Sequence, residues 1–269
     1  MRGTERQVKL TLPDFSDISL AVHGSVDRVI SERIFKNGYW EPFETSILIS
    51  SLREGYSFLD VGANIGYFTI LAARLVGPSG SVYSFEPEPV NFRLMSKSLS
   101  QNKLSNQVKA MRIALSNRDS EEKLYLSADN YGDHQLYPDK KDKKSILVTL
   151  RHGSRLLLND ITRLHFIKVD TQGSEYEVLD GLMPMLLSLT SLPRMLIELT
   201  PYSLRTASSS GEALINLIRE LGAKLWIVDH VNHELVATTA DHLCTWCNNV
   251  DATPGDRGFI NIFVGESPF

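Results

Sequence analysis

The chain has 269 residues, of which 42% are hydrophobic and 22% charged, and a formal net charge of −4. This composition is ordinary for a soluble globular protein whose core is large enough to fold without disulfides or a metal. The negative charge argues against a surface for nucleic acid or anionic membranes, and two cysteines cannot form a disulfide framework.

The chain is expected to be cytoplasmic and to lack a transmembrane segment. Its N-terminus has no apolar region of the kind found in signal peptides. The longest apolar stretch, around residues 182–192, contains Pro184 and is too short to span a bilayer. The length fits one large domain, or one domain with an appendage.

The first 50 residues predict a small β-rich cap. Apolar and polar residues alternate over residues 8–12 and 18–22, as in short strands. Residues 42–52 are expected to form a helix, because Pro42 suits a first helical position and apolar residues recur at helical spacing.

From residue 56 onward, strand and helix patterns alternate, which predicts an α/β fold with a Rossmann-like, mostly parallel, seven-stranded sheet and helices on both faces. The last strand follows a loop without a helix, so we expect it to run antiparallel. Residues 51–269 are expected to form this domain, with 116–163 as an insertion on the substrate side. The expected strands cover 57–61, 81–85, 108–113, 164–169, 194–199, 224–229 and 259–264. The expected helices cover 65–75, 90–102, 175–189 and 211–221.

A tight turn with Asp60, Gly62 and Gly66 joins the first of these strands to its helix. The spacing Asp-x-Gly-x-x-x-Gly differs from the Gly-x-Gly-x-x-Gly of dinucleotide folds, where the glycines let a pyrophosphate approach backbone N–H groups. Ala63 and Asn64 occupy the crest of the turn. The turn therefore suits a nucleoside ligand without phosphates, although glycine also serves any ordinary strand-to-helix turn.

Glu86 follows the second expected strand in the segment Phe85-Glu86-Pro87. A carboxylate at this place can accept hydrogen bonds from both ribose hydroxyls, as the acid after the second strand does in dinucleotide folds. Pro87 restricts the path of the chain and so fixes the position of Glu86. The alternative is a solvated loop acid.

Two further strand ends supply candidate site residues. Ala114, Leu115 and Ser116 end the third expected strand and are suited to line an adenine ring, or form an ordinary buried strand end. Asp170 ends the fourth strand and is expected beside the first strand, at the point where the strand order reverses. Ser174, with acids in the first helical turn, gives a capping pattern for the next helix.

Together these segments resemble the FkbM family of class I S-adenosylmethionine-dependent methyltransferases. The resemblance runs from about residue 38 to residue 200, and only the combination of its motifs is specific. The matching segments are 58–68, 85–87, 113–116, 129–134 and 167–179, and 38–42 resembles the segment that precedes the first strand in the family.

The resemblance implies a role for each matching residue. The Asp60 turn would lie under the methionine part of the cofactor, Glu86 would hold the ribose, and Asp170 would lie near the reacting centre. Glu41 would bind near the cofactor's amino group, or act only as a capping acid. The cofactor site implied in this way comprises Glu41, Asp60, Gly62, Ala63, Asn64, Gly66, Phe68, Glu86, Pro87, Ala114, Leu115, Ser116 and Asp170.

Methyl transfer to oxygen is helped by a base, because a neutral hydroxyl is a weak nucleophile. His134, in the polar loop 129–134, is the first candidate, with a surface loop histidine as the alternative. Asp170 is the second candidate, and Asp133 is placed to orient the histidine. At Thr171-Gln172 the family more often has a hydrophobic residue and an acid, which removes one carboxylate and weakens any metal site.

The expected function is S-adenosylmethionine-dependent O-methylation of a secondary metabolite or saccharide, the latter including sugars of cell-surface glycans or lipopolysaccharide. The absence of the Gly-x-Gly-x-x-Gly motif counts against an NAD-dependent oxidoreductase. The intact acids count against a non-catalytic binding module, which would not need them. An alternative adds Mg²⁺, shared by Asp170 and Glu198 at adjacent strand ends. The oligomeric state stays open, with a homodimer among the alternatives.

Two clusters stand outside this site. His230, His233, His242, Cys244 and Cys247 lie close in sequence, but their spacing matches no known zinc finger, so we expect two reduced thiols beside a strand and no zinc. The basic run at 140–144 is expected to be a solvated loop, with binding of an acidic acceptor as the alternative.

Overall fold

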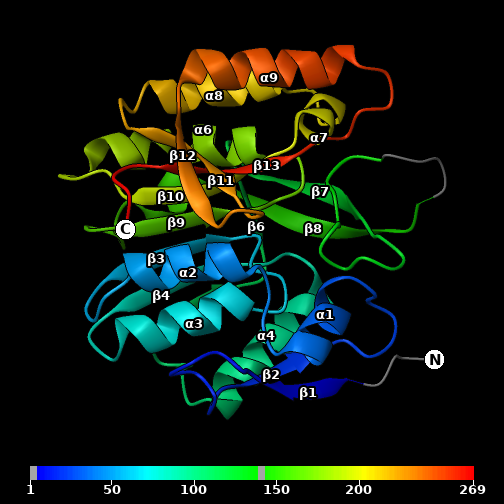
Figure 1. Ribbon diagram of the computed structural model, residues 1–269. Helices are drawn as coiled ribbons and strands as arrows, with labels where there is room; N and C mark the ends of the chain where they lie inside the picture. Colours follow the sequence, from blue (N-terminus) through cyan, green and yellow to red (C-terminus); the bar gives the residue numbers. More distant parts are fainter. Residues whose placement is uncertain (1–4, 139–142) are drawn as a thin grey trace.

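The computed structural model describes residues 5–138 and 143–269, and the basic run lies mostly outside them. Its centre is an eight-stranded sheet in the order β12-β11-β13-β10-β9-β3-β4-β5 (Figure 1). The α/β fold and the mostly parallel sheet are confirmed, and β13 runs antiparallel to both β10 and β11 as predicted. The strands are β3 (Ser57–Val61), β4 (Ser81–Phe85), β5 (Val108–Met111), β9 (Phe166–Val169), β10 (Arg194–Leu199), β11 (Leu225–Asp229), β12 (Glu234–Thr238) and β13 (Ile260–Val264).

Two features of the C-terminal part differ from the prediction. The sheet has an eighth strand, because β12 folds back on β11 as an antiparallel hairpin at the sheet edge. The segment before β13 contains the helix α9 (Ala240–Ala252), so the expected loop without a helix was wrong. The antiparallel direction of β13 was therefore predicted correctly from an incorrect premise.

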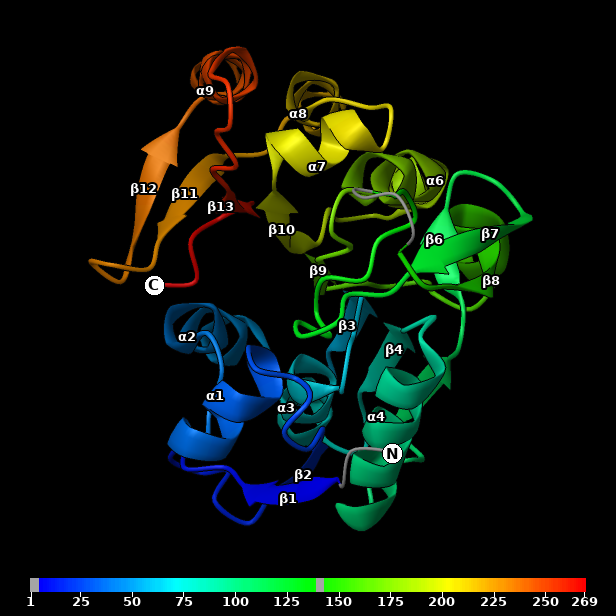
Figure 2. The same cartoon turned by 90° about the vertical axis from the view of Figure 1, so that its right-hand side faces the viewer.

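Helices cover both faces of the sheet, as Figures 1 and 2 show. One face carries α2, α3 and α4, and the other carries α6 and α8, with α9 packed outside against α7 and α8. The helices of the N-terminal part are α1 (Ile30–Asn37), which contacts β1 and β2, and α2 (Pro42–Ser51), α3 (Tyr67–Val76) and α4 (Pro89–Gln101). The remaining helices besides α9 are α5 (Gly153–Leu157), α6 (Glu175–Ser188), α7 (Pro201–Thr206) and α8 (Gly211–Arg219).

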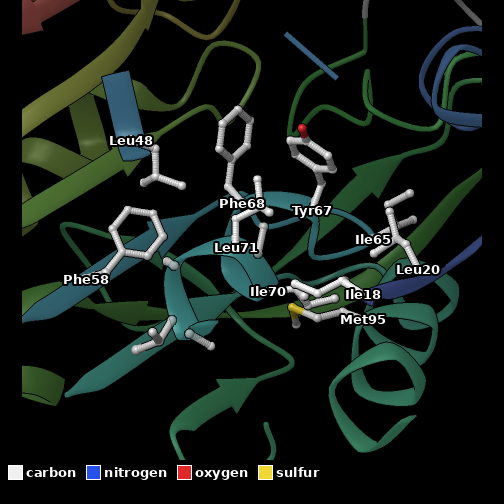
Figure 3. Close-up of a cluster of buried hydrophobic side chains, with 14 of the residues drawn as sticks. Ile18, Leu20, Leu48, Phe58, Ile65, Tyr67, Phe68, Ile70, Leu71 and Met95 are labelled. Carbon is white, nitrogen blue, oxygen red and sulfur yellow. The ribbon is translucent and has the colours of Figure 1, made fainter. Parts of the chain in front are cut away.

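The N-terminal segment shares its hydrophobic core with the first face of the sheet. The strands β1 (Arg6–Lys9) and β2 (Ser19–Val22) form a separate antiparallel pair. Leu20 of β2, Ile70 of α3 and Met95 of α4 belong to one buried cluster (Figure 3). Full burial of one such side chain contributes about 1.5–3 kcal/mol. The helix α1 was not predicted, and the division into a cap at 1–50 and a domain at 51–269 stays a prediction.

Three strands between residues 114 and 152 form a separate sheet in the order β6-β8-β7. Its strands are β6 (Ala114–Ser116), β7 (Ser120–Tyr125) and β8 (Ser145–His152). The expected third strand therefore ends at Met111, and 114–116 belongs to a different sheet. None of the helices in the described residues is long and apolar enough to cross a membrane.

Candidate active site

The site lies where the strand order reverses, at the carboxyl ends of β3 and β9. These two strands are adjacent and parallel, with β4 on the far side of β3 and β10 on the far side of β9. Two cavities open at this edge, named here the Glu86 cavity and the Lys168 cavity. They share a wall made by Gly62, Asn64, Gly132, Asp170 and Gln172.

The Glu86 cavity is lined by residues that include Pro87, Asn91, Ala114 and Leu115. Glu86 is 6% exposed. One of its carboxylate oxygens accepts from the N–H of Asn64 and the other from that of Glu88, both at 2.9 Å. Burial raises the pKa of Glu86 to about 7. Backbone N–H groups therefore fix the carboxylate at the cavity wall, where a pair of ribose hydroxyls can reach it.

Gly62 makes the turn between β3 and α3 possible. Its φ of +86° lies in the left-handed region, and a Cβ added there would lie 1.9 Å from the main-chain oxygen of Asp170. The N–H groups of Gly62 and Ala63 both donate to the carbonyl of Phe85, at 3.0 Å. The turn is thus closed by backbone contacts to both neighbouring strands, which only glycine permits.

The loop 129–134 is tied to the core by its backbone. The carbonyl of Tyr131 accepts from the side-chain amides of Asn64 and Asn91, each at 3.1 Å. The His23 ring meets the Tyr131 ring edge-on, with centroids 4.5 Å apart. These contacts place Gly132 against both cavities and His134 in the Glu86 cavity.

The contacts of His134 argue against the role expected for it. Its Nδ1 accepts from the N–H of Ser127 at 3.0 Å, so the neutral ring carries its hydrogen on Nε2. Burial lowers the pKa of His134 to about 4. Nε2 is therefore a donor and has no lone pair to take a proton. Asp133 accepts from the side-chain amide of Gln135 at 2.8 Å.

The larger Lys168 cavity gathers acids around one buried lysine. Nζ of Lys168 donates to Asp170 Oδ2 at 2.7 Å and lies 4.8 Å from the centre of the Phe68 ring. Burial alone lowers the pKa of Lys168, but the carboxylates of Asp170, Glu41 and Asp60 outweigh it and raise this pKa.

Burial disfavours the charged forms of the acids in this cavity. Burial raises the pKa of Asp60 to about 6, even though Thr69 donates to it at 2.5 Å. Burial also raises the pKa of Glu41 to about 8. Glu41 has a left-handed φ of 41°, and such strain in a residue other than glycine is often found at functional sites. The cavity is thus suited to a ligand that brings positive charge.

Gln172 links the ends of β9 and β10. Its Nε2 donates to Asp170 Oδ1 at 2.7 Å and to Glu198 Oε2 at 2.8 Å. The amide nitrogen thereby occupies the space between the two carboxylates where a shared Mg²⁺ would have to lie. Burial, with the negative charge of Asp170, raises the pKa of Glu198. These two acids do not fit a metal site as Gln172 holds them.

The turn before α6 is closed by Glu175 and not by the expected side-chain cap of Ser174. The Glu175 carboxylate accepts from the N–H groups of Thr171 at 2.8 Å and Gly173 at 2.9 Å. The acid reaches back into the turn and so leaves the serine hydroxyl out of it. This contact fixes the backbone that presents Asp170 and Gln172.

Most of the predicted cofactor residues meet at the two cavities. Ala63 and Phe68 line the Lys168 cavity together with Asp60 and Glu41. Two other predicted cofactor residues, Gly66 and Ser116, make packing contacts within the described chain. Gly66 directly precedes α3 and packs against Met95. The main-chain oxygen of Ser116 packs against Gly181, where an added Cβ would lie only 2.1 Å from it. These two close approaches fix the positions of α3 and α6.

The histidines and cysteines near the C-terminus do not form one cluster. His242 bonds Thr238 at the start of α9, His233 stacks on Phe43, and Cys247 is a buried free thiol of α9. The two thiols therefore lie on a helix. The expectation that they lie beside a strand was wrong. Among the described residues, no group of three or more histidine, cysteine or acidic side chains is placed to hold a metal ion.

The sequence analysis assigned no role to Lys168, Asn91 or Glu44. Lys168 carried a usable signal, since a lysine within a buried strand almost always has a charged partner. Glu44 carried another, because it lies among apolar residues at the start of the helix 42–51 and is only 2% exposed. Asn91 shows no such signal, because its partners come from other parts of the chain.

Comparison with known proteins gives the chain its family. The model of the methyltransferase FkbM domain matches residues 60–225. "Methyltransferase sdnD" of Sordaria araneosa is 26% identical over 163 residues, 49% of this chain and 62% of that protein. "31-O-demethyl-FK506 methyltransferase FkbM" of Streptomyces tacrolimicus is 26% identical over 194 residues, 71% of this chain and 73% of that protein.

The matches to the first two curated relatives span 62% and 57% of their lengths, which is less than two thirds. A solved structure, the C-terminal domain of precorrin-6Y C5,15-methyltransferase from Rhodobacter capsulatus, is 14% identical. It aligns over 90% of this chain and 94% of that one, with a TM-score of 0.46. The family match covers more than half of the chain and includes the end of β3, the Asp60 turn, β4, β9 and the segment 170–175. The chain therefore belongs to the FkbM methyltransferase family.

Proposed function

We propose that the protein is an S-adenosylmethionine-dependent O-methyltransferase. The observation that carries the proposal is the pairing of the two cavities across one wall. A buried carboxylate, Glu86, faces one cavity, and the wall at Gly62 and Asp170 separates this cavity from a second one that is rich in acids. The family membership supports the same assignment.

The residues present fit this cofactor. S-adenosylmethionine supplies an electrophilic methyl group on a positively charged sulfur. Asp60, Asp170 and Glu41 gather around Lys168 as the cation among them, so positive charge brought by a ligand is electrostatically favoured. In this proposal Glu86 binds the ribose hydroxyls, and Ala114 and Leu115 line the base.

The acceptor is proposed to be a hydroxyl of a secondary metabolite. The Lys168 cavity presents the aromatic side chains of Tyr39, Trp40 and Phe259 beside its polar groups, and such surfaces bind ring systems that carry hydroxyls. The relative from Streptomyces tacrolimicus is named for such an acceptor. A saccharide, including a cell-surface glycan, is the second acceptor class that these residues accommodate.

The proposed reaction does not require Mg²⁺. Asp170 and Glu198 are the acids that would share it, but both accept from the Gln172 amide. We therefore expect methyl transfer to continue in excess chelator. Loss of activity in chelator, with recovery on adding Mg²⁺, would reverse this part of the proposal.

Calorimetric titration tests the cofactor, with S-adenosylmethionine, S-adenosylhomocysteine and NAD each added to the purified protein. We expect saturable binding of the first two that weakens in Glu86→Ala. Binding of NAD alone, or no binding, would overturn the proposal. Transfer of a labelled methyl group to a panel of hydroxylated macrolides and methyl glycosides then separates the two acceptor classes.

A further inference from the structure

A polar cluster of Glu44, His230 and Asn261 lies on the wall of the Lys168 cavity. Its members come from three separate elements, since Glu44 is on α2, His230 follows β11, and Asn261 is on β13. Glu44 and Asn261 are 2% and 9% exposed. The His230 side chain is 43% exposed. The cluster therefore joins a buried carboxylate to an accessible imidazole.

One carboxylate oxygen organises the cluster. Oε1 of Glu44 accepts from Asn261 Nδ2 at 2.8 Å and is 3.0 Å from His230 Nδ1. Because an ionised carboxylate only accepts hydrogen bonds, Nδ1 must carry the hydrogen. The neutral ring then has its lone pair on Nε2, which has no hydrogen-bond partner among the described residues.

The other candidate bases are less suited to take a proton. His134 receives a backbone N–H on Nδ1, so its ring has the opposite tautomer, with the hydrogen on Nε2. Asp170 accepts from Lys168 on one oxygen and from Gln172 on the other, each at 2.7 Å, so both oxygens are already engaged. Of the two histidines that line the cavities, only His230 presents a free lone pair.

We propose that His230 Nε2 takes the proton of the acceptor hydroxyl and that Glu44 is the positioning residue for the imidazole. The proposal rests on the O-methyltransferase function proposed above. As the hydroxyl oxygen bonds to the methyl carbon, the carbon–sulfur bond breaks and its electron pair goes to sulfur, giving the neutral thioether. The hydroxyl proton passes to Nε2, and the Glu44 carboxylate balances the positive ring until the proton leaves to water.

The tautomer of His230 is the first test. Long-range proton–nitrogen spectra are recorded at pH 8 on the whole protein, labelled with nitrogen-15 histidine and bound to S-adenosylhomocysteine. His230→Asn assigns the signals. We expect Nδ1 to be protonated and Nε2 bare, with Glu44→Gln shifting the Nδ1 signal. An Nε2-protonated ring would overturn the proposal.

Kinetics with the panel compound that the enzyme methylates give the second test. His230→Asn should lower kcat by about 100- to 10,000-fold, with little change in KM. Glu44→Gln keeps an acceptor oxygen but loses the charge, and should lower kcat by about tenfold or more. His233→Asn, three residues along and stacked on Phe43 outside the proposed machinery, is the matched control and should keep full activity.

Calorimetry with S-adenosylhomocysteine separates the two proposals. If the wild-type protein does not bind it, the proposed function fails. If His230→Asn binds it as the wild type does and also keeps full kcat, only the role of His230 is overturned. If the panel contains no acceptor, the tautomer of His230 tests the proposal alone. A ring protonated on Nδ1 that responds to Glu44→Gln supports it, and any other result overturns it.

Discussion

The two cavities of this site are built in different ways. The Glu86 cavity depends on backbone groups close in sequence to β3 and β4, namely the Gly62 turn and the N–H groups that hold Glu86. The Lys168 cavity depends on side chains from both ends of the chain, such as Glu44 and Asn261, which are bonded although 217 positions apart. The first can be recognised from a local motif, whereas the second exists only once the sheet has formed.

The electrostatics differ in the same way. Two backbone N–H groups hold Glu86, and these donors persist whatever side chains surround them. In the Lys168 cavity the ammonium group of Lys168 balances Asp60, Asp170 and Glu41, with Arg33 also acting on Glu41, so the cavity relies on removable side chains. We therefore expect the largest mutational effects there.

Lys168→Met should be the most damaging substitution. It leaves buried carboxylates without their cation, a change that typically costs about 3–5 kcal/mol. The pKa values of Asp60 and Glu41, already raised to about 6 and about 8, would rise further, so the folded variant holds protons more tightly than its unfolded chain. Its stability deficit should be greatest at pH 8 and shrink as the pH falls toward 5.5.

Urea denaturation of wild type and variant at both pH values measures this effect. Lys109→Met is the matched control, because it breaks an exposed ion pair with Asp160, and such pairs contribute at most about 1 kcal/mol. A deficit for Lys168→Met that does not change with pH would contradict the charge-balance account of the cavity.

Gly62→Ala tests the backbone origin of the Glu86 cavity. The new Cβ would meet the Asp170 carbonyl at 1.9 Å in a backbone conformation with a φ of +86°. Strain and overpacking together should cost about 3 kcal/mol and abolish binding of S-adenosylhomocysteine. Gly222→Ala has a φ of +65° with nothing within 4 Å, so it should cost only the strain of about 1–2 kcal/mol and leave binding intact. Equal losses in the two variants would show that the clash does not matter.

The fold was predictable where strand and helix periods were regular. All seven expected strands occur, from β3 to β13, because buried parallel strands give continuous apolar runs. The edge strand β12 was missed because it is short and most of it faces solvent. The sheet β6-β8-β7 was missed because its strands lie in a polar segment and pair partly across the long loop between β7 and β8.

The site was predictable to the extent that its residues follow strand ends. Asp60, Glu86 and Asp170 lie at the cavities because the carboxyl ends of parallel strands meet at one edge. The orientation of His134 depends on a backbone N–H seven residues away, which no motif records. The bridge from Gln172 to Glu198 likewise requires the register of β9 and β10.

Glu86→Gln should weaken the binding of S-adenosylhomocysteine by about 10- to 100-fold, because hydrogen bonds to a charged group contribute about 1.5–3 kcal/mol. Glu88→Gln is its matched control. Glu88 is equally buried, at 6%, but its carboxylate caps α4 by accepting from Val90 and Asn91. It should lose about 1 kcal/mol of stability and no affinity. Similar affinities for the two variants would remove Glu86 from the ligand site.

The smallest expected effect is a pH dependence that comes from Glu41. Its pKa is raised to about 8, so below that pH the carboxyl is largely neutral and above it largely charged. A cationic ligand binds the charged form better, so the affinity for S-adenosylmethionine should rise by about tenfold between pH 6.5 and pH 9. Titrations of wild type and Glu41→Gln across this range give the difference in affinity between the two proteins at each pH. Any titration of the ligand itself is common to both proteins and cancels in this difference. The slope should flatten in Glu41→Gln and persist in Glu54→Gln, an exposed glutamate of the same charge. A slope that survives in Glu41→Gln would assign the pH dependence to another group, and the Lys168 cavity would then bind its ligand without help from the strained residue Glu41.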